Sequence, residues 1–147
     1  MVRNIMSSGS SVHVVRARHP VWKQVQVSLR PKARGCHLVT NELRDSLDAN
    51  LRDMEMGLAH LWIMHTSASL TVNENCDPSV RTDMESSLNR IVGSGHKLFT
   101  HMDEGDDDMP AHVKSSLMGA GLTIPISKVG MSTCVYLDLI CWSRRGH

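Results

Sequence analysis

Apolar and polar residues alternate along residues 21–29, and a period of two is typical of a half-buried strand. The apolar side of this segment consists of Val21, Val25, Val27 and Leu29. A second alternation runs from His65 to Asn73, where small hydroxyls, one histidine and one asparagine share a face. Between these segments, residues 57–64 are apolar on both faces except for one histidine, which predicts an interior strand.

Three segments have helical spacing instead. Residues 40–51 carry a leucine at every fourth position, after Thr40 or Asn41 as the cap. Asp77 as N-cap and Pro78 at the first helical position predict a second helix, which Gly93 ends. Asp108 is predicted to cap a third, short helix that ends at Gly119. The apolar positions of the three helices are Leu43, Leu47 and Leu51; Val80, Met84, Leu88, Ile91 and Val92; and Val113 and Leu117.

Two more strands are expected, over residues 122–126 and 133–142, and Pro125 indicates an edge position or a bulge in the first. Strands and helices follow one another in mixed order, which predicts an α+β fold with two or three helices. The length of 147 residues suits one domain. We therefore expect a flexible N-terminal extension over residues 1–19 and a single domain over residues 20–147.

Composition narrows the range of functions. The net charge is +1 and aromatic residues make up 3% of the chain, which argues against a nucleic-acid partner. No apolar run approaches the roughly 18–20 residues of a membrane span, so no membrane partner is expected. The 4 cysteines include no C-x-x-C pair, which favours reduced thiols and a cytoplasmic location. Organelle targeting by the Arg- and Ser-rich N-terminus stays open.

The loop from His101 to His112 is the first candidate for chemistry, because two imidazoles flank a dense group of carboxylates. Imidazole with carboxylate suits Zn²⁺, and carboxylates alone suit Mg²⁺ and its bound phosphates. The alternative is a solvated acidic loop in which Asp108 only caps a helix. A second candidate is His65, as a metal ligand or a general base, with Ser67 and Ser69 beside it. It could equally be a histidine at a strand end that bonds a backbone carbonyl.

Five motifs together resemble the YjbQ-like family, over roughly residues 21–128. They are RGCHLVT (34–40), HTSASLTVNEN (65–75), DP (77–78), HMDEGDDDMPAHVKSSLMG (101–119) and LTIPI (122–126). The resemblance implies a compact α+β fold with β-sandwich-like, mostly antiparallel sheets, assembled as a homotrimer. It also implies a secondary thiamine-phosphate synthase activity, which joins a hydroxymethylpyrimidine diphosphate to a thiazole phosphate and releases diphosphate. The implied ligand is thus a small phosphorylated molecule.

The resemblance also implies which residues form the site, in a cavity near the subunit contacts. His65, Asp103 and Glu104 would be catalytic, and Ser67, Asn73 and Glu74 would bind the ligand. If an ion is present, His65, His101 and His112 would supply nitrogen ligands. A divalent ion, Zn²⁺ or Mg²⁺, is the expected cofactor, and no organic cofactor is expected.

The chain departs from the family pattern at several positions. Met102 stands where the family usually has Asn, and Asp106 where it usually has Pro. From about Val129 the sequence is atypical, and the family's Gly-Arg pair and Gly-Thr-Trp-Gln-Gly run are absent. Either Arg144 and Arg145 replace a phosphate-binding arginine from a different position, or the site is impaired. A non-catalytic trimer that binds a metal or phosphate ligand, or a degenerate member of unknown function, is therefore the alternative to an enzyme.

Overall fold

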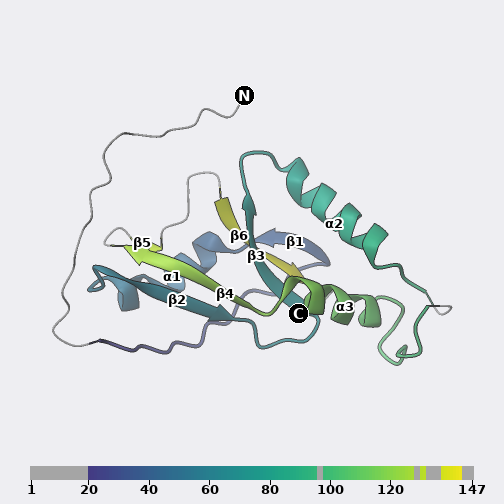
Figure 1. Ribbon diagram of the computed structural model, residues 1–147, viewed down its shortest axis with the longest axis horizontal. Helices are drawn as coiled ribbons and strands as arrows, with labels where there is room; N and C mark the ends of the chain where they lie inside the picture. Colours follow the sequence, from purple (N-terminus) through teal and green to yellow (C-terminus); the bar gives the residue numbers. More distant parts are fainter. Residues whose placement is uncertain (1–19, 96–97, 128–129, 132–136, 144–147) are drawn as a thin grey trace.

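Two three-stranded antiparallel sheets and three helices make up the part of the chain that the structure, a computed structural model, describes: residues 20–95, 98–127, 130–131 and 137–143. One sheet has the strand order β1-β6-β3 and the other β2-β4-β5 (Figure 1). The expected α+β fold with antiparallel sheets is confirmed. The elements are β1 (Gly35–Leu38), α1 (Thr40–Leu51), β2 (Met56–Trp62), β3 (Ala68–Glu74), α2 (Ser79–Ile91), α3 (Asp108–Met118), β4 (Gly121–Ser127), β5 (Gly130–Met131) and β6 (Leu137–Ser143).

The core forms where α1 meets both sheets. The leucine spacing of α1 turns Leu43 and Leu47 inward, where they pack with Val39, Leu70 and Ile124. A smaller apolar cluster of Leu88 and Ala111 lies between α2 and α3, with Cys36 and Met118 packed against it. The helix α2 contacts β1, and α3 contacts β3. The two helices therefore cover the β1-β6-β3 sheet on the face opposite to the one that packs against the leucines of α1.

The helices end where the sequence predicts, but the predicted N-caps are wrong: Val39 rather than Thr40 or Asn41 holds the cap position of α1, and Pro78 rather than Asp77 holds that of α2. Asp77 accepts a hydrogen bond from the backbone N–H of Ser79 at 2.8 Å, which lowers the pKa of its carboxyl. Gly119 ends α3 with a φ of +92°, a conformation that favours glycine. The prediction that Asp108 caps α3 is wrong, because the helix begins at Asp108 itself and Asp107 holds the cap position. The Asp108 carboxylate is thereby available for other contacts.

The apolar run at residues 57–64 was predicted to be an interior strand, and that prediction is also wrong. Among the described residues β2 pairs only with β4, so it lies at an edge of its sheet. Its side chains alternate in exposure, and Leu58 and Trp62 are 71% and 66% exposed. An apolar sequence alone could not separate a strand buried on both faces from one with an uncovered face.

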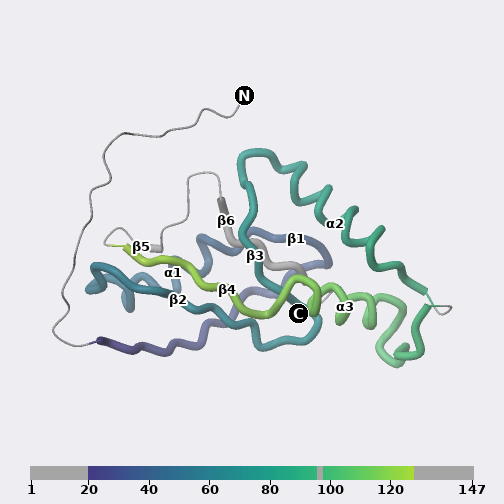
Figure 2. Tube along the Cα trace, viewed as in Figure 1, coloured from purple at the N-terminus to yellow at the C-terminus, as the bar shows by residue number. Residues whose placement is uncertain are grey.

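Two further strand predictions have mixed outcomes. The segment at residues 21–29 is extended but joins no ladder, and it lies beside β2 (Figure 2). Pro125 pairs with Leu58 on β2, while the ladder to β5 begins only at Ile126, so the missing N–H of the proline falls outside that ladder. Of the predicted final strand, residues 137–142 belong to β6 and the remainder lies outside the described residues, as do Val129, Arg144 and Arg145.

None of the described helices has the length and apolar character needed to cross a membrane. Cys36 and Cys76, in the part of the chain that the structure describes, are in no disulfide bond, and the reduced state of the four cysteines stays a prediction. The location of the protein and the flexible extension over residues 1–19 stay predictions.

Glu42 on α1 anchors the extended segment at residues 20–33. Its carboxylate accepts a bond from the backbone N–H of Arg30 and one from Lys32 Nζ at 2.7 Å. The carboxylate is 11% exposed, and this burial opposes its ionisation. The hydrogen bonds from Lys32 and Arg30 outweigh the burial, so the net effect lowers the pKa of Glu42 below its usual 4.5.

Replacing Glu42 with Gln is expected to lower the free energy of unfolding by about 1–2 kcal/mol at pH 7, since charge-assisted bonds are lost. Because the folded-state pKa is depressed, this contribution is present above pH 4.5 and is lost as the pH falls through the folded-state value. Urea denaturation of both proteins at pH 7 and at acidic pH measures the effect. An equal difference at both pH values would contradict it. Asp48→Asn, in an exposed pair with Arg52, is the control and should cost less than about 0.5 kcal/mol.

Candidate metal centre

Three potential ligand atoms, from His101, Asp108 and His112, lie within 4.8 Å of one another. The Asp108 carboxylate lies between the two rings: its Oδ2 is 3.0 Å from His101 Nε2, and its Oδ1 is 3.5 Å from His112 Nε2. The ring centroids are 5.6 Å apart. The two imidazole nitrogens therefore approach the same carboxyl group from two sides.

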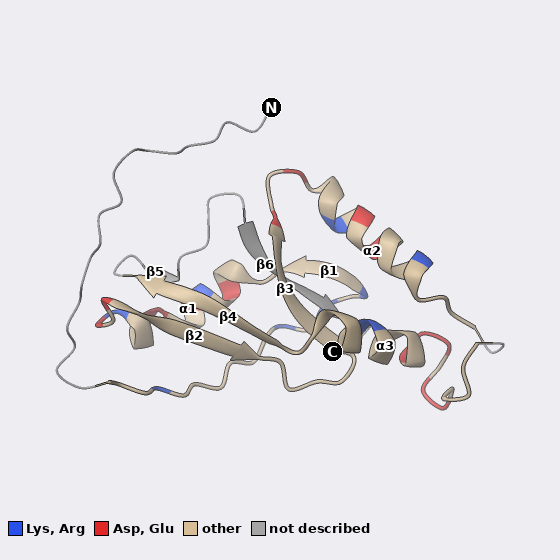
Figure 3. Cartoon of the chain, in the orientation of Figure 1, with Lys and Arg blue, Asp and Glu red and all other residues tan. Residues whose placement is uncertain are grey.

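The local fold explains why these residues meet. Asp108 and His112 are four residues apart at the start of α3, so their side chains lie on one face of the helix. His101 returns to this face through a tight turn, in which the Gly105 N–H bonds Met102 O at 3.1 Å. Gly105 has a φ of +110°, which a residue with a side chain rarely adopts. Figure 3 shows the acidic loop leading into α3.

His112 is held in place from behind by the chain that precedes β3. Its Nδ1 lies 3.1 Å from Thr66 O and 3.4 Å from Ser67 Oγ. A carbonyl oxygen only accepts, so Nδ1 carries the hydrogen, which leaves Nε2, on the side of Asp108, as the ring nitrogen that can bind a metal ion. A backbone acceptor behind a histidine is the usual support for a metal-binding imidazole.

Burial decreases from Asp108 outward. The Asp108 side chain is 2% exposed, that of His112 28% and that of His101 51%. A cation held by all three would therefore rest on a buried carboxylate and face solvent on its other side. Such a site keeps coordination positions open for water or a ligand, as catalytic metal sites do and closed structural sites do not.

The structure brings together only part of the predicted site. His101 and His112 join the group, whereas His65 is not one of its three members: its Nδ1 accepts a bond from the Ser67 N–H at 2.9 Å, and the residue lines a cavity of about 850 Å³. Ser67 is buried and reaches His112. The exposed loop residues Asp103 and Glu104 are not among the three clustered ligands.

Asn73 and Glu74 lie at the opposite end of β3 from Ser67, which at about 3.3 Å per residue amounts to roughly 20 Å. Asn73 Oδ1 accepts the backbone N–H of Glu74 at 2.7 Å. The structure thus separates this pair from the histidine cluster. Conversely, sequence reasoning missed Asp108 as a ligand. The signal was present in the i, i+4 spacing of Asp108 and His112.

Comparison with known proteins places the chain in a family. The family model described as UPF0047 protein YjbQ-like matches residues 23–136. The chain belongs to the YjbQ-like UPF0047 family. The UPF0047 protein YjbQ of Salmonella typhimurium is 48% identical over 106 residues, 72% of this chain and 75% of that protein. The UPF0047 protein YjbQ of Escherichia coli O157:H7 is 43% identical over 127 residues, 86% of this chain and 91% of that protein.

Solved structures of this YjbQ-like family share the fold. A crystal structure of an uncharacterized conserved protein of the family from Clostridium acetobutylicum matches with a TM-score of 0.66 and 26% identity. The match covers 78% of this chain and 85% of that one. The resemblance to the family is therefore confirmed both in sequence and in structure.

The prediction of a thiamine-phosphate synthase activity is wrong by this comparison. The matched relatives carry the UPF0047 name, which assigns them no activity, and the solved structures are described as uncharacterized or of unknown function. Nothing in these relatives supports a transferase that joins two thiamine precursors. A member of a family without an established function is the interpretation that fits.

Proposed function

We propose that this YjbQ-like protein binds a divalent metal ion through His101 Nε2, the Asp108 carboxylate and His112 Nε2. The observation that carries the proposal is the convergence of these three ligand atoms within 4.8 Å. Two imidazoles with one carboxylate form a donor set typical of Zn²⁺ and of related transition metals. Mg²⁺ suits the set less well, because it prefers oxygen ligands in an octahedral arrangement.

The open side of the site is suited to an anionic ligand, and a small phosphorylated molecule is the class that we propose. A phosphate oxygen can occupy a coordination position that three protein ligands leave free. The loop itself contributes five carboxylates between Asp103 and Asp108, which attract a cation and repel a free anion. Binding of inorganic phosphate should therefore require the metal, and isothermal titration with and without Zn²⁺ separates the two cases.

Replacing His112 with Ala is expected to weaken Zn²⁺ binding at least tenfold, because one of three ligands is removed. The cost in stability should be about 1 kcal/mol, the contribution of its bond to Thr66 O. Zinc content after equilibrium dialysis, measured by elemental analysis, tests the assignment. His60→Ala is the matched control, since His60 bonds Thr123 at the other sheet and lies outside the cluster. Unchanged zinc occupancy in the His112 variant would refute the site.

The homotrimer is likewise a proposal, and the uncovered face of β2 supports it. Met56, Leu58, Trp62 and Met64 are each more than half exposed, and association would cover such a surface. Light scattering at micromolar concentration should give about three times 16.3 kDa. The mass of a single chain would contradict the trimer.

A further inference from the structure

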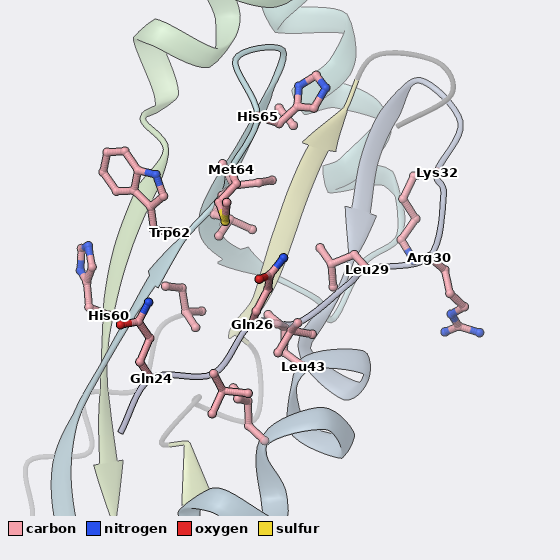
Figure 4. Close-up of a pocket in the computed structure, with 17 residues that line it drawn as sticks. Gln24, Gln26, Leu29, Arg30, Lys32, Leu43, His60, Trp62, Met64 and His65 are labelled. Atoms are coloured by element: carbon pink, nitrogen blue, oxygen red, sulfur yellow. The ribbon is translucent and has the colours of Figure 1, made fainter. Parts of the chain in front are cut away.

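A long groove separates the extended segment at residues 20–33 from the edge of β2. Two adjoining cavities form it, of about 670 and 850 Å³, and both have the extended segment as one wall and β2 with its neighbouring residues as the other. Figure 4 shows the larger cavity, with Gln26 and Leu29 from the extended segment on one side and His60 and Trp62 on the other. The groove therefore runs along the whole length of β2.

Both walls of the groove are extended backbone without a partner strand. Among the described residues, β2 has a ladder to β4 and to no other strand. The segment at residues 20–33 takes part in no ladder of the described chain. Unpaired strand edges offer backbone N–H and C=O groups to an added strand. An extended peptide suits such a groove, because its backbone carries donors and acceptors on both of its edges.

The inner surface of the groove is apolar. Leu43 and Leu47 on α1 and Leu70 on β3 line the larger cavity, and all three are buried. In an added strand, alternate side chains would face this surface and the others would face away from it. A peptide that fits the groove therefore alternates apolar and polar residues.

The two walls run in the same direction (Figure 1). Residues 20–25 line the smaller cavity together with residues 53–61, and residues 24–32 line the larger one together with residues 60–65. A strand that runs between them in the opposite direction would be antiparallel to both. Every ladder in the described part of the fold is antiparallel, so such a strand would continue the existing pattern.

The end of the groove beside residues 30–32 is positively charged. Arg30 and Lys32 line the larger cavity, and none of the described residues that line it is an aspartate or a glutamate. Both cations pair with the carboxylate of Glu42, so two positive charges and one negative charge leave a net charge of +1. His65 lies toward the same end as Lys32 (Figure 4). Its Nδ1 accepts the Ser67 N–H, so its neutral ring carries a hydrogen at Nε2 and can donate to an anion.

The opposite end of the groove is negatively charged. Asp53 and Glu55 line the smaller cavity and are exposed. Lys23 also lines this cavity, and its Nζ donates to Asn50 O at 2.7 Å. One positive and two negative charges leave a net charge of −1 at this end. The groove thus has a polarity that distinguishes the two ends of an antiparallel peptide.

We propose that the groove binds an extended peptide segment of another protein as an antiparallel strand. The peptide has an acidic residue near its amino end, beside Arg30 and Lys32, and a basic residue near its carboxyl end, beside Asp53 and Glu55. Apolar and polar residues alternate between these two. This site is separate from the proposed metal centre, because none of the three clustered ligands lines either cavity.

A second copy of the chain fits the groove less well than a separate peptide does. Each described strand of a second copy is already paired along one edge or both, so it could not pair with both walls. The unpaired segment at residues 20–33 is held against α1 by the bonds of Glu42 and Lys23. A peptide segment with both edges open meets neither obstacle.

Fluorescence anisotropy with a labelled seven-residue peptide, the length of β2, tests the proposal. The peptide Glu-Val-Thr-Val-Thr-Val-Lys, with blocked ends, is expected to bind the full chain with a micromolar Kd. The peptide with Glu and Lys exchanged has the same composition, and it should bind about tenfold more weakly because both charge pairs become repulsive. A peptide with N-methyl groups on alternate amides should also bind at least about tenfold more weakly, since it cannot form one set of strand hydrogen bonds.

A charge reversal in the protein locates the binding site. Asp53→Lys with Glu55→Lys should weaken binding of the first peptide about tenfold, because the basic end of the peptide then meets two added cations. Asp45→Lys with Asp83→Lys is the matched control: both residues are exposed, neither lines a cavity of the groove, and the net charge changes by the same amount. The control should bind the peptide almost as the wild type does.

Three results would overturn the proposal. The first is no saturable binding of the first peptide, and the second is equal affinity for the peptide with exchanged charges or for the N-methylated one. The third comes from amide hydrogen exchange of the chain without peptide. Protection of the β2 amides on the groove side that falls on dilution would assign the groove to a second copy. Slower exchange of these amides only when the first peptide is added is the result that we expect.

Discussion

Replacing Lys114 with Ala is expected to lower the free energy of unfolding by about 2–4 kcal/mol, as for other fully buried long side chains cut back to alanine. Lys114 lies on α3 and is 1% exposed, so its four-carbon stem is packed on all sides. Its Nζ donates to Asn89 Oδ1 on α2 at 2.5 Å. Alanine would leave a cavity between the two helices that close over the sheet.

The charge of Lys114 contributes less to the free energy of unfolding than the packing of its side chain does. Burial lowers the pKa of the ammonium group; the charge of Glu85 opposes this, and that of Arg34 adds to it. Asn89 would keep its bond from Arg34 after the lysine is lost, so no acceptor is abandoned. Lys114→Met retains most of the volume and removes the charge, and we expect a change below about 1.5 kcal/mol.

The pH dependence of stability separates the contribution of the Lys114 charge from that of its packing. The folded-state pKa of Lys114 lies below the usual 10.5, so the unfolded chain binds more protons between these values. The stability of the wild type relative to Lys114→Met should therefore rise as the pH increases through the folded-state value toward 10.5. Urea denaturation from pH 7 to 10.5 measures both effects. A Met variant as unstable as the Ala variant would show that the charge is required.

The helices of this fold could be predicted from sequence because their signals are local. The leucine spacing of α1 and Gly119 after α3 are found where expected, and Asp77-Pro78 directly precedes α2, although Pro78 rather than Asp77 holds the cap position. Strand partners depend on residues far apart in the chain. Periodicity therefore indicated an extended segment at residues 21–29 but not that it would lack a ladder, and it could not place β2 at an edge.

The site shows the same division between local and distant information. His101 and His112 are recognisable in the sequence because they flank the acidic loop. Asp108 could either cap the helix or bind a metal, and the sequence does not decide between these two roles. Capping is the commoner role for an aspartate at a helix start, and the structure gives that position to Asp107. The position of His65 depends on how the chain enters β3. Its Nδ1 accepts the bond from the Ser67 N–H, and no spacing rule contains that contact.

Asp108→Asn is expected to weaken Zn²⁺ binding by more than 100-fold, the largest effect predicted for the metal centre. The substitution keeps the size and shape of the side chain, which matters because Asp108 is buried at the base of the cluster. It removes the negative charge that lies between the two imidazoles, and a neutral amide oxygen is a poor replacement for a carboxylate on Zn²⁺. His101 and His112 alone would leave a two-ligand site open to solvent.

The increase in the free energy of unfolding when Zn²⁺ is added measures this loss of zinc affinity. At a free zinc concentration of 100 times the wild-type Kd, the free energy of unfolding of the wild type should rise by about 2.7 kcal/mol, and that of Asp108→Asn by less than about 0.5 kcal/mol. Asp103→Asn removes the same charge from an exposed position on the same loop and should respond almost as the wild type does. If both variants lost the response equally, the general negative potential of the loop would hold the ion. A selective loss in Asp108→Asn requires a contact, because the two substitutions change the net charge by the same amount.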